Sequence, residues 1–274
     1  MSVPAASVSD FTGHTVAVTG GAGDIGRAVA RHLGGLGARI ALLDVDAEKL
    51  AAVEGELSEG GIVVETAVCD VTVAEQVGRA VEDLAARCGP MHHLFNNAGY
   101  QGAFTPTHTY PVDDFERVMR INVTGAFIVL KAFAVHMIAA GGGSIVNTAS
   151  MAAFSGPPNM LAYATSKAAL IGLTQTASKD LAPHGVRVNA ISPALIGPGV
   201  LWTRQVELQA AAGSQYFGPD TEVVARQMID GVPMRRYGSL EEIPGTVAYL
   251  LSDSASYITG INIPIAGGLL PGRS

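Results

Sequence analysis

The sequence predicts a single α/β domain built on a doubly wound, seven-stranded parallel sheet with helices on both faces. Short apolar segments alternate with longer segments of helical period along the whole chain. Several short segments are nearly unbroken runs of β-branched residues, as expected of parallel strands that are buried on both faces. The length of 274 residues fits one large domain, and neither a break in composition nor an internal repeat marks a second one.

The alternation assigns each element a place. The expected strands are Thr15–Thr19, Arg39–Leu43, Ile62–Val68, His92–Asn96, Ser144–Thr148, Val186–Ile191 and Ile261–Ile265. The expected helices are Ile25–Leu36, Ala47–Leu57, Ala74–Ala86, Val112–Ala139, Leu161–Leu181 and Leu240–Leu251. We expect a flexible arm at residues 1–11 and one domain over 12–274. Residues 193–231, rich in Pro, Gly and Gln and holding a short helix at Thr203–Ala211, are expected to form a substrate lid.

Composition excludes several classes of protein. The formal net charge is −7 and no run of Lys or Arg offsets it, so no nucleic-acid partner is expected. The charged fraction of 15% is low, which suits a subunit that covers part of its surface with copies of itself. The first residues show no positive start followed by an apolar stretch, so secretion is not expected, and no uninterrupted apolar stretch reaches membrane-spanning length. Cys69 and Cys88 are expected to be free thiols, the histidines show no metal-binding spacing, and a cytoplasmic location is expected.

A glycine-rich turn joins the first strand to the first helix. Its sequence from Thr19 is Thr-Gly-Gly-Ala-Gly-Asp-Ile-Gly. Glycines permit a tight turn and a close approach to a pyrophosphate, and the N-terminus of the helix favours its negative charge. A plain strand-to-helix turn is the alternative, but the position after the first strand favours a dinucleotide site. The residues expected to contact the cofactor here are Gly20, Gly23, Asp24, Ile25 and Gly26.

Two carboxylates follow the next strands. Asp44 ends the second strand, where it can accept hydrogen bonds from ribose hydroxyls and repel the extra phosphate of NADP. NAD is therefore the predicted cofactor, with a helix cap or turn as the alternative role for Asp44. Asp70, followed by Val71, closes the third strand and can hold the adenine, cap the next helix, or do both.

A tyrosine and a lysine stand four residues apart at the start of a predicted helix. Tyr163 and Lys167 then share one helix face, and a neighbouring ammonium together with an oxidised nicotinamide favours the phenolate. Ser150, just after the fifth strand, can orient the reacting oxygen. Asn122 can hold a water that links Lys167 to solvent, or it can be a structural residue that distorts its helix. The combination predicts acid–base chemistry by Tyr163.

The joint order and spacing of these residues resembles the classical short-chain dehydrogenase/reductase family, from about Phe11 to Gly268. The residues that carry the resemblance are Thr19-Gly20…Gly26, Asp70-Val71, Asn96-Asn97-Ala98-Gly99, Asn122, Ser150, Tyr163-x-x-x-Lys167 and Pro193.

The resemblance implies a Rossmann-type fold and a Ser–Tyr–Lys centre in which Asn122 completes a proton relay and Lys167 holds the nicotinamide ribose. It implies that Asn97, Ala98 and Gly99 steady the central strand and the cofactor, and that Pro193 and the backbone near Ile196 bind the nicotinamide side. It also implies a homotetramer or homodimer in which the last strand lies at a subunit interface.

The chain departs from the family pattern at two points. Asp24 stands where the family has its middle glycine, and Gly23 comes one residue early. Because Asp tolerates left-handed backbone better than most residues, we expect the turn to survive. Pro193 is followed by Ala194 where the family has glycine.

The loops outside the catalytic set resemble bacterial NAD-dependent polyol dehydrogenases of the xylitol type. The segments concerned are 97–104, 156–160, 202–209, 213–217 and 232–237. The hypothesis is oxidation of a secondary hydroxyl of a linear polyol to a ketose, with Gln101, Asn159 and Gln205 reading further hydroxyls. Gln101 and Asn159 can equally be ordinary loop residues.

Trp202, assigned to the substrate pocket, is more simply explained by packing within the lid. Two rival functions stay open at this point. One is a carbonyl reductase for another substrate, such as a 3-oxoacyl thioester, a diketone or a cyclic ketone. The other is a protein that binds NAD without turnover.

Overall fold

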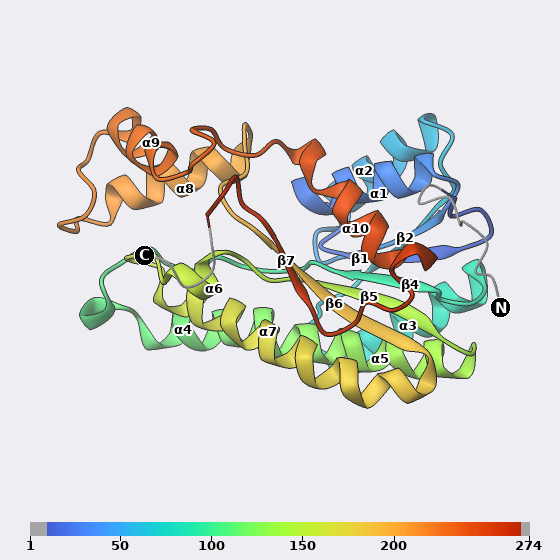
Figure 1. Cartoon of the computed structure of the whole chain (residues 1–274). Coiled ribbons are helices and arrows are strands. Elements are labelled where there is room, and N and C mark those ends of the chain that lie inside the picture. Colours follow the sequence, from blue (N-terminus) through green and yellow to red (C-terminus); the bar gives the residue numbers. More distant parts are fainter. Residues whose placement is uncertain (1–9, 270–274) are drawn as a thin grey trace.

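The computed structural model describes residues 10–269 (Figure 1). Residues 1–9 of the predicted arm lie outside the described residues. Phe11, the last residue assigned to the arm, is 1% exposed and donates its backbone N–H to the carbonyl of Leu36 at 2.8 Å. The folded domain therefore begins at or before Phe11.

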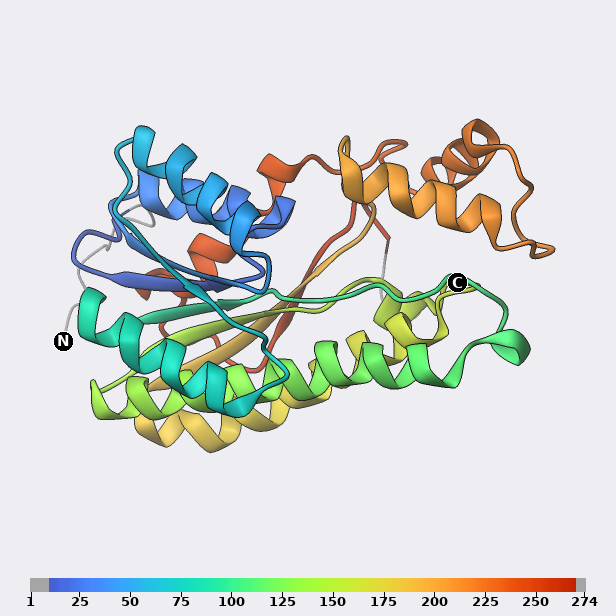
Figure 2. The same cartoon turned by 180° about the vertical axis from the view of Figure 1, so that it is seen from behind.

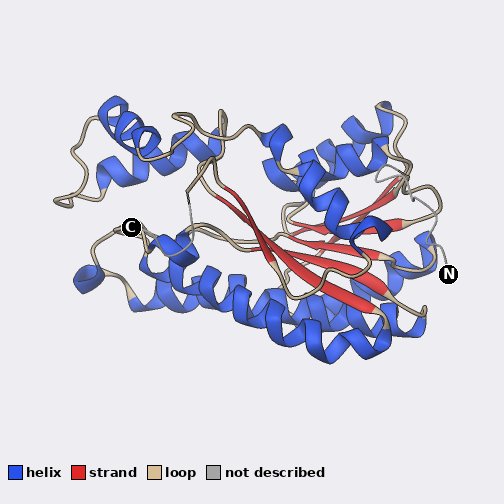
Figure 3. Cartoon of the chain, in the orientation of Figure 1, coloured by secondary structure: helices blue, strands red, loops and turns tan. Residues whose placement is uncertain are grey.

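Seven parallel strands form one sheet in the order β3-β2-β1-β4-β5-β6-β7. The strands are drawn in red in Figure 3. The strands are β1 (Thr15–Thr19), β2 (Arg39–Asp44), β3 (Val64–Val68), β4 (His93–Asn96), β5 (Gly143–Thr148), β6 (Val186–Pro193) and β7 (Asn262–Ile265). All five residues of β1 are buried, as the apolar composition predicted for a strand covered on both faces. The order reverses between β1 and β4, which creates the crevice where ligands of such sheets bind.

Helices cover both faces of the sheet (Figure 2). One face carries α1 (Asp24–Gly35), α2 (Ala47–Glu59) and α10 (Pro244–Leu251), and the other carries α3 (Ala74–Cys88), α5 (Ala126–Ala139) and α7 (Leu161–Leu181). Each layer has its own apolar core, centred on Leu33 and Val247 on the first face and on Leu84 and Phe133 on the second. The prediction of a doubly wound α/β domain is confirmed.

The helix predicted at Val112–Ala139 is continuous but not uniform. It consists of α4 (Val112–Met119), a π-helical turn η2 (Arg120–Gly125) and α5. By length and composition this is the only helix in residues 10–269 that can cross a membrane, with a mean hydropathy of 1.7 over its most apolar window. The buried side of α5, which includes Val129 and Phe133, packs on α3 and the sheet. The core accounts for this buried side only, since Phe127, Val135 and Ile138 on the outer side of α5 are exposed.

Other boundaries differ slightly from the predictions. Strands expected from Ile62, His92 and Ile261 begin one or two residues later, and the helix expected from Leu240 starts as a 3-10 turn, η4 (Leu240–Glu242). Pro244 then begins α10, because its missing N–H costs nothing in the first turn. The remaining short elements are η1 (Thr107–Thr109), α6 (Ala152–Ser155), η3 (Ala182–His184) and η5 (Asp253–Ala255).

The segment after β6 forms a separate helical layer beyond the end of the sheet (Figure 1). It contains α8 (Val200–Ala211), which starts three residues before the predicted position, and α9 (Thr221–Asp230). Val206, Ala210 and Val224 form its small apolar core, with Trp202 packed against them. We call residues 200–230 the lid.

Candidate active site

The carboxyl ends of the parallel strands meet at one edge of the sheet, and the predicted site residues gather there. Thr19, Asp44 and Asn96 end β1, β2 and β4, while Thr148 and Pro193 end β5 and β6. The loops after these strands carry the remaining candidates. The topology therefore brings residues from positions 19 to 196 to a single edge.

The glycines of the first turn are required by close contacts. Gly20 has a φ of 63°, and a side chain there would lie 3.0 Å from the Cα of Ala98. A Cβ at Gly26 would lie 2.2 Å from the carbonyl oxygen of Gly20. Gly23 closes the turn by donating its N–H to that same oxygen at 3.1 Å. The turn thus presents backbone at the start of α1, as a pyrophosphate site needs.

Asp24 is the first residue of α1, with Gly23 as the cap. We expected Asp24 to tolerate a left-handed backbone, but its backbone is helical. The left-handed residue of the turn is Gly20, four residues earlier. The carboxylate lies close to the residue that precedes the lid, since a Cβ at Gly199 would lie 3.7 Å from Oδ2. Ile25 packs against the core beneath α1.

Asp44 is tied to the turn by both carboxylate oxygens. Oδ2 accepts the N–H of Ala22 at 3.0 Å and Oδ1 accepts that of Asp46 at 3.1 Å. Asp46, not Asp44, caps α2. The carboxylate therefore stands beside the glycine-rich turn with lone pairs left for ribose hydroxyls.

Asp70 stabilises the loop between β3 and α3 through two hydrogen bonds. Its Oδ1 accepts the N–H of Thr72 at 2.8 Å, and its backbone N–H donates to Gln76 at 3.0 Å. Neither bond is a side-chain cap on α3, whose first flanking residue is Val73. Val71 packs against the π-helical turn, since a Cβ at Gly125 would lie 2.9 Å from its Cγ2.

The segment after β4 locks three strands together. The Asn97 side chain donates to the carbonyl of Thr19 at 3.2 Å and accepts from the Thr148 hydroxyl at 3.2 Å. Ala98 donates its N–H to the Thr19 hydroxyl at 3.1 Å. A Cβ at Gly99 would lie 3.4 Å from Asn122 Oδ1 and 3.5 Å from Lys167 Nζ, so this glycine lies beside two candidate catalytic groups.

Tyr163 and Lys167 share one face of α7, as their spacing predicted. Lys167 Nζ lies 5.5 Å from the centroid of the Tyr163 ring and donates to the carbonyl of Thr148 at 2.7 Å. The Ser150 side chain also meets the phenol, and its Oγ accepts the N–H of Ala152 at 3.2 Å. The structure thus brings the predicted Ser, Tyr and Lys together.

The polypeptide alone does not make the phenol acidic. Burial raises the pKa of Tyr163, and the hydrogen bond with Ser150 only opposes this shift. Burial also lowers the pKa of Lys167 from 10.5 to about 8. The predicted lowering of the tyrosine pKa therefore depends on the positive charge of an oxidised nicotinamide beside it.

Asn122 lies in the π-helical turn and is fully buried. Its amide donates to the Tyr100 carbonyl at 2.8 Å and to Ser166 Oγ at 2.9 Å, while its Oδ1 accepts the N–H of Tyr100 at 2.7 Å. Ser166 donates in turn to the carbonyl of Tyr163 at 2.8 Å. Both amide protons are used, so a relay water at this residue would have to donate to Oδ1 or be bound by main-chain atoms.

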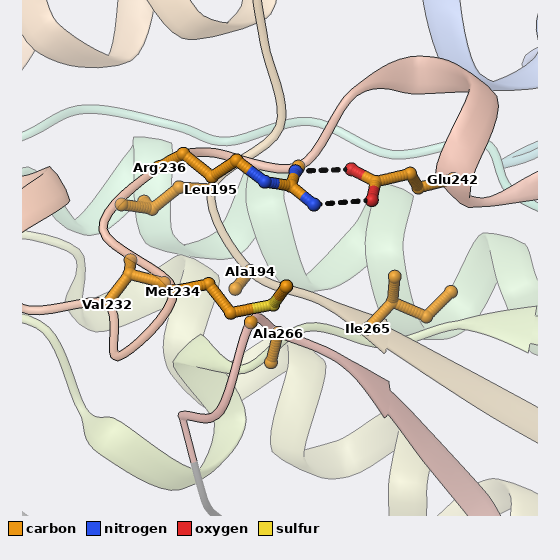
Figure 4. A pocket seen from close by; sticks show the side chains of 10 residues that line it. Ala194, Leu195, Val232, Met234, Arg236, Glu242, Ile265 and Ala266 are labelled. Atoms are coloured by element: carbon orange, nitrogen blue, oxygen red, sulfur yellow. Dashed lines mark hydrogen bonds and ion pairs between the residues drawn. The ribbon is translucent and has the colours of Figure 1, made fainter.

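Pro193 and Ile196 lie at the end of β6. The Pro193 carbonyl is 3.4 Å from Ser150 Oγ, and Ile196 is buried beside Gly238. Behind this segment lies a cavity of about 190 Å³ lined by Ala194, Leu195, Val232, Met234, Arg236, Gly238, Glu242, Ile265, Ala266 and Gly267 (Figure 4). None of the predicted catalytic residues lines it.

The predicted substrate residues have different surroundings. Gln101 and Gln205 are half-buried, and within residues 10–269 their side chains make no hydrogen bond. Asn159 is buried, and its amide donates to Gln209 Oε1 at 2.8 Å and to Ser214 Oγ at 3.0 Å. Trp202 packs on Tyr237, with ring centroids 5.4 Å apart, as the packing role predicted.

Sequence reasoning assigned no role to Gln209, Thr148 or Ser166. Gln209 is a polar residue on the stripe of α8 that buries Val206 and Ala210, and this break in the apolar pattern was its signal. Thr148 meets Lys167 through its backbone, which no side-chain pattern reveals.

The chain matches known proteins over nearly its whole length. The family model described as Enoyl-(Acyl carrier protein) reductase covers residues 20–270. Levodione reductase of Leifsonia aquatica is 35% identical over 270 residues, 98% of each chain. 2-(S)-hydroxypropyl-CoM dehydrogenase 3 of Xanthobacter autotrophicus is 36% identical over 259 residues, 93% of this chain and 95% of its own. The solved structure of NAD+-bound xylitol dehydrogenase has a TM-score of 0.93 and 57% identity, and covers 94% of this chain and 99% of its own.

The chain therefore belongs to the short-chain dehydrogenase/reductase family. It is an oxidoreductase of that family, acting on alcohols and ketones. The predictions of the family, the fold and the enzyme class are confirmed, and a protein that binds the cofactor without turnover is no longer a rival.

Proposed function

We propose that this enzyme oxidises a secondary hydroxyl of a linear, xylitol-like polyol to a ketone, with NAD as its cofactor. The observation that carries the proposal is the convergence of Ser150, Tyr163 and Lys167 beside a loop whose Gln101 has no partner within the described chain. The 57% identity to a xylitol dehydrogenase supports the substrate class.

When bound, NAD+ would supply the acceptor for the hydride that leaves the carbon carrying the hydroxyl. The Ser150 hydroxyl orients the substrate oxygen, and the Tyr163 phenolate takes its proton. Lys167, held by the Thr148 carbonyl, lies one helical turn from Tyr163, where an ammonium favours the phenolate and can bind ribose hydroxyls. The proton then leaves Tyr163 by way of Lys167 and the Asn122 turn. For carbonyl reduction the same groups act in reverse, with Tyr163 as the acid.

The choice of NAD over NADP rests on Asp44. Its carboxylate is fixed by two backbone N–H groups next to the glycine-rich turn, so an additional phosphate on the ribose would meet a negative charge. The solved relative at 57% identity holds NAD+.

The test is a panel of linear polyols, small diketones, cyclic ketones and steroids, each assayed with NAD(H) and NADP(H). We expect the highest kcat/KM with a linear polyol and NAD, and a preference that shifts toward NADP in Asp44→Asn. Activity with diketones and none with polyols would overturn the polyol assignment in favour of a carbonyl reductase, the activity named for the Leifsonia relative.

We further propose a cytoplasmic homotetramer or homodimer without a membrane or nucleic-acid partner. The outer side of α5 exposes Phe127, Val135 and Ile138, and Leu161 is exposed at the start of α7. Exposed apolar side chains on two helices of the same sheet face favour self-association. The edge strand β7 is a second candidate surface, since Tyr257 and Ile261 beside it are exposed. Sedimentation and fractionation test these proposals.

A further inference from the structure

Asn159 lies where three loops on the substrate side of the site meet. It is 8% exposed and has a left-handed φ of 67°. Its carbonyl accepts the N–H of Thr105 at 2.9 Å, from the loop after β4 that also carries Gln101. The next residue, Met160, is the flanking residue of α7, so Asn159 also precedes the turn that bears Tyr163.

The side chain of Asn159 is directed to the lid. One amide proton goes to Gln209 Oε1 at 2.8 Å and the other to Ser214 Oγ at 3.0 Å. Gln209 in turn donates an Nε2 hydrogen bond to the carbonyl of Pro158 at 3.2 Å. Because Gln209 is 1% exposed, losing these partners would leave a buried amide unsatisfied.

We propose that Asn159 is a positioning residue that latches the lid onto the 156–160 loop and thereby sets the walls of the substrate pocket. This replaces the role predicted from sequence, in which Asn159 reads substrate hydroxyls. Both of its donors are already used, and their acceptors belong to the protein. The choice of test substrates rests on the proposed function, whereas the contacts of Asn159 come from the structure alone.

The latch acts on one half of the site. Asn159, Gln209 and Ser214 follow β5 and β6, whereas Gly20 and Asp44 lie at the ends of β1 and β2 and make no hydrogen bond with these three residues. Loss of the latch should therefore weaken closure over the substrate and leave NADH binding unchanged. If Asn159 acts through the lid and not on a substrate group, its loss should weaken closure equally for any substrate.

The experiment uses Asn159→Gly, Gln209→Met and the double variant. Glycine adopts a φ of 67° without strain, so the first variant reports on the amide alone. Methionine keeps the volume of Gln209 but not its polar atoms. The matched control is Gln227→Ala, an exposed glutamine on α9 of the same lid.

For each single variant we expect KM to rise about tenfold, the effect of losing one or two hydrogen bonds, with kcat changed less. The rise should be the same for xylitol and for 2-butanol, and the double variant should be no worse than the worse single variant. The NADH dissociation constant, measured by fluorescence, should stay the same. A rise confined to xylitol, or multiplied in the double variant, would overturn the latch in favour of direct hydroxyl reading.

Limited proteolysis supplies a readout that needs no turnover. Arg204 and Arg226 are exposed trypsin sites in the lid. Cleavage there should be faster in Asn159→Gly and Gln209→Met than in the wild type or in Gln227→Ala. Unchanged cleavage in both latch variants would overturn the proposal. If the wild type oxidises no secondary alcohol, the proposed function fails, while this assay still decides on the latch.

Discussion

The partners and the pKa of Tyr163 depend to different degrees on its local sequence and on the completed fold. Its partnership with Lys167 is predictable because residues four apart share a helix face. The direction in which its pKa shifts is not predictable from the sequence, because the burial that raises the pKa arises only in the completed fold. The same holds for Asn159, whose identity indicates a polar contact but whose partners at 209 and 214 are fixed only by the path of the lid.

Tyr163→Phe should separate chemistry from binding. Removing the hydroxyl deletes the acid–base group, so kcat should fall by about 10²- to 10⁴-fold. The ring and its contact with Lys167 remain, so the NADH dissociation constant should change little. Steady-state kinetics and fluorescence titration measure the two quantities. Retained turnover in this variant would mean that another group transfers the proton.

Asp24→Asn tests the unusual acid in the glycine-rich turn. The carboxylate is at the first position of α1, where the pyrophosphate is expected, and like charges repel. We expect the asparagine variant to bind NADH more tightly, with the gain shrinking as salt screens the charge. Titrations at low and high ionic strength measure this, with Glu48→Gln at the start of α2 as the control. An equal gain at both salt concentrations would rule out the electrostatic explanation.

At the scale of elements, periodicity located nearly every helix and strand, because apolar patterning decides which side of each element is buried. It missed the π-helical turn, since one wide turn leaves the apolar composition of Arg120–Gly125 unremarkable. It also missed Gln209, because nothing local says that α8 faces the 156–160 loop. Contacts between elements that are far apart in the sequence could not be predicted from the sequence.

Gly26→Ala should damage the junction of β1 and α1. The added methyl would lie 2.2 Å from the Gly20 carbonyl, so backbone must move. We expect a loss of about 1–3 kcal/mol in the free energy of unfolding, together with weaker NADH binding. Urea unfolding and NADH titration measure these effects. Gly35→Ala, at the other end of α1 with nothing within 4 Å, is the control and should be neutral or stabilising. Equal behaviour of the two variants would contradict the close-packing argument.

At the scale of the whole molecule, the two edges of the sheet have different chemistry. The amino edge holds His14, His92 and His93, whose spacing in the sequence did not suggest that they meet. His14 Nδ1 lies 2.9 Å from His93 Nε2, and its ring stacks on His92. Burial, aided by the neighbouring histidines, lowers the pKa of His93 from 6.5 to about 3. No metal-binding cluster of His, Cys, Asp or Glu is found within residues 10–269.

This edge should make the protein acid-sensitive. His93 stays neutral in the folded state, whereas the unfolded chain binds a proton near pH 6.5, so stability falls as the pH drops from about 6.5 toward 3. The slope from one proton is at most about 1.4 kcal/mol per pH unit. Urea unfolding between pH 7.5 and 5 measures it. His93→Leu should flatten the slope and the exposed His32→Gln should not. An unchanged slope in His93→Leu would assign the acid sensitivity to other groups.

The π-helical turn at Arg120–Gly125 changes which side of the continuous helix faces the protein before and after it. An extra residue in a turn rotates everything after it by about 100° around the axis. The segment before it can therefore face the 99–110 loop while the segment after it keeps Val129 and Phe133 on the sheet. Deleting one polar residue here would remove no apolar side chain, yet it would rotate one half of the helix toward the wrong neighbour. Relatives that gain or lose a residue should do so outside this stretch.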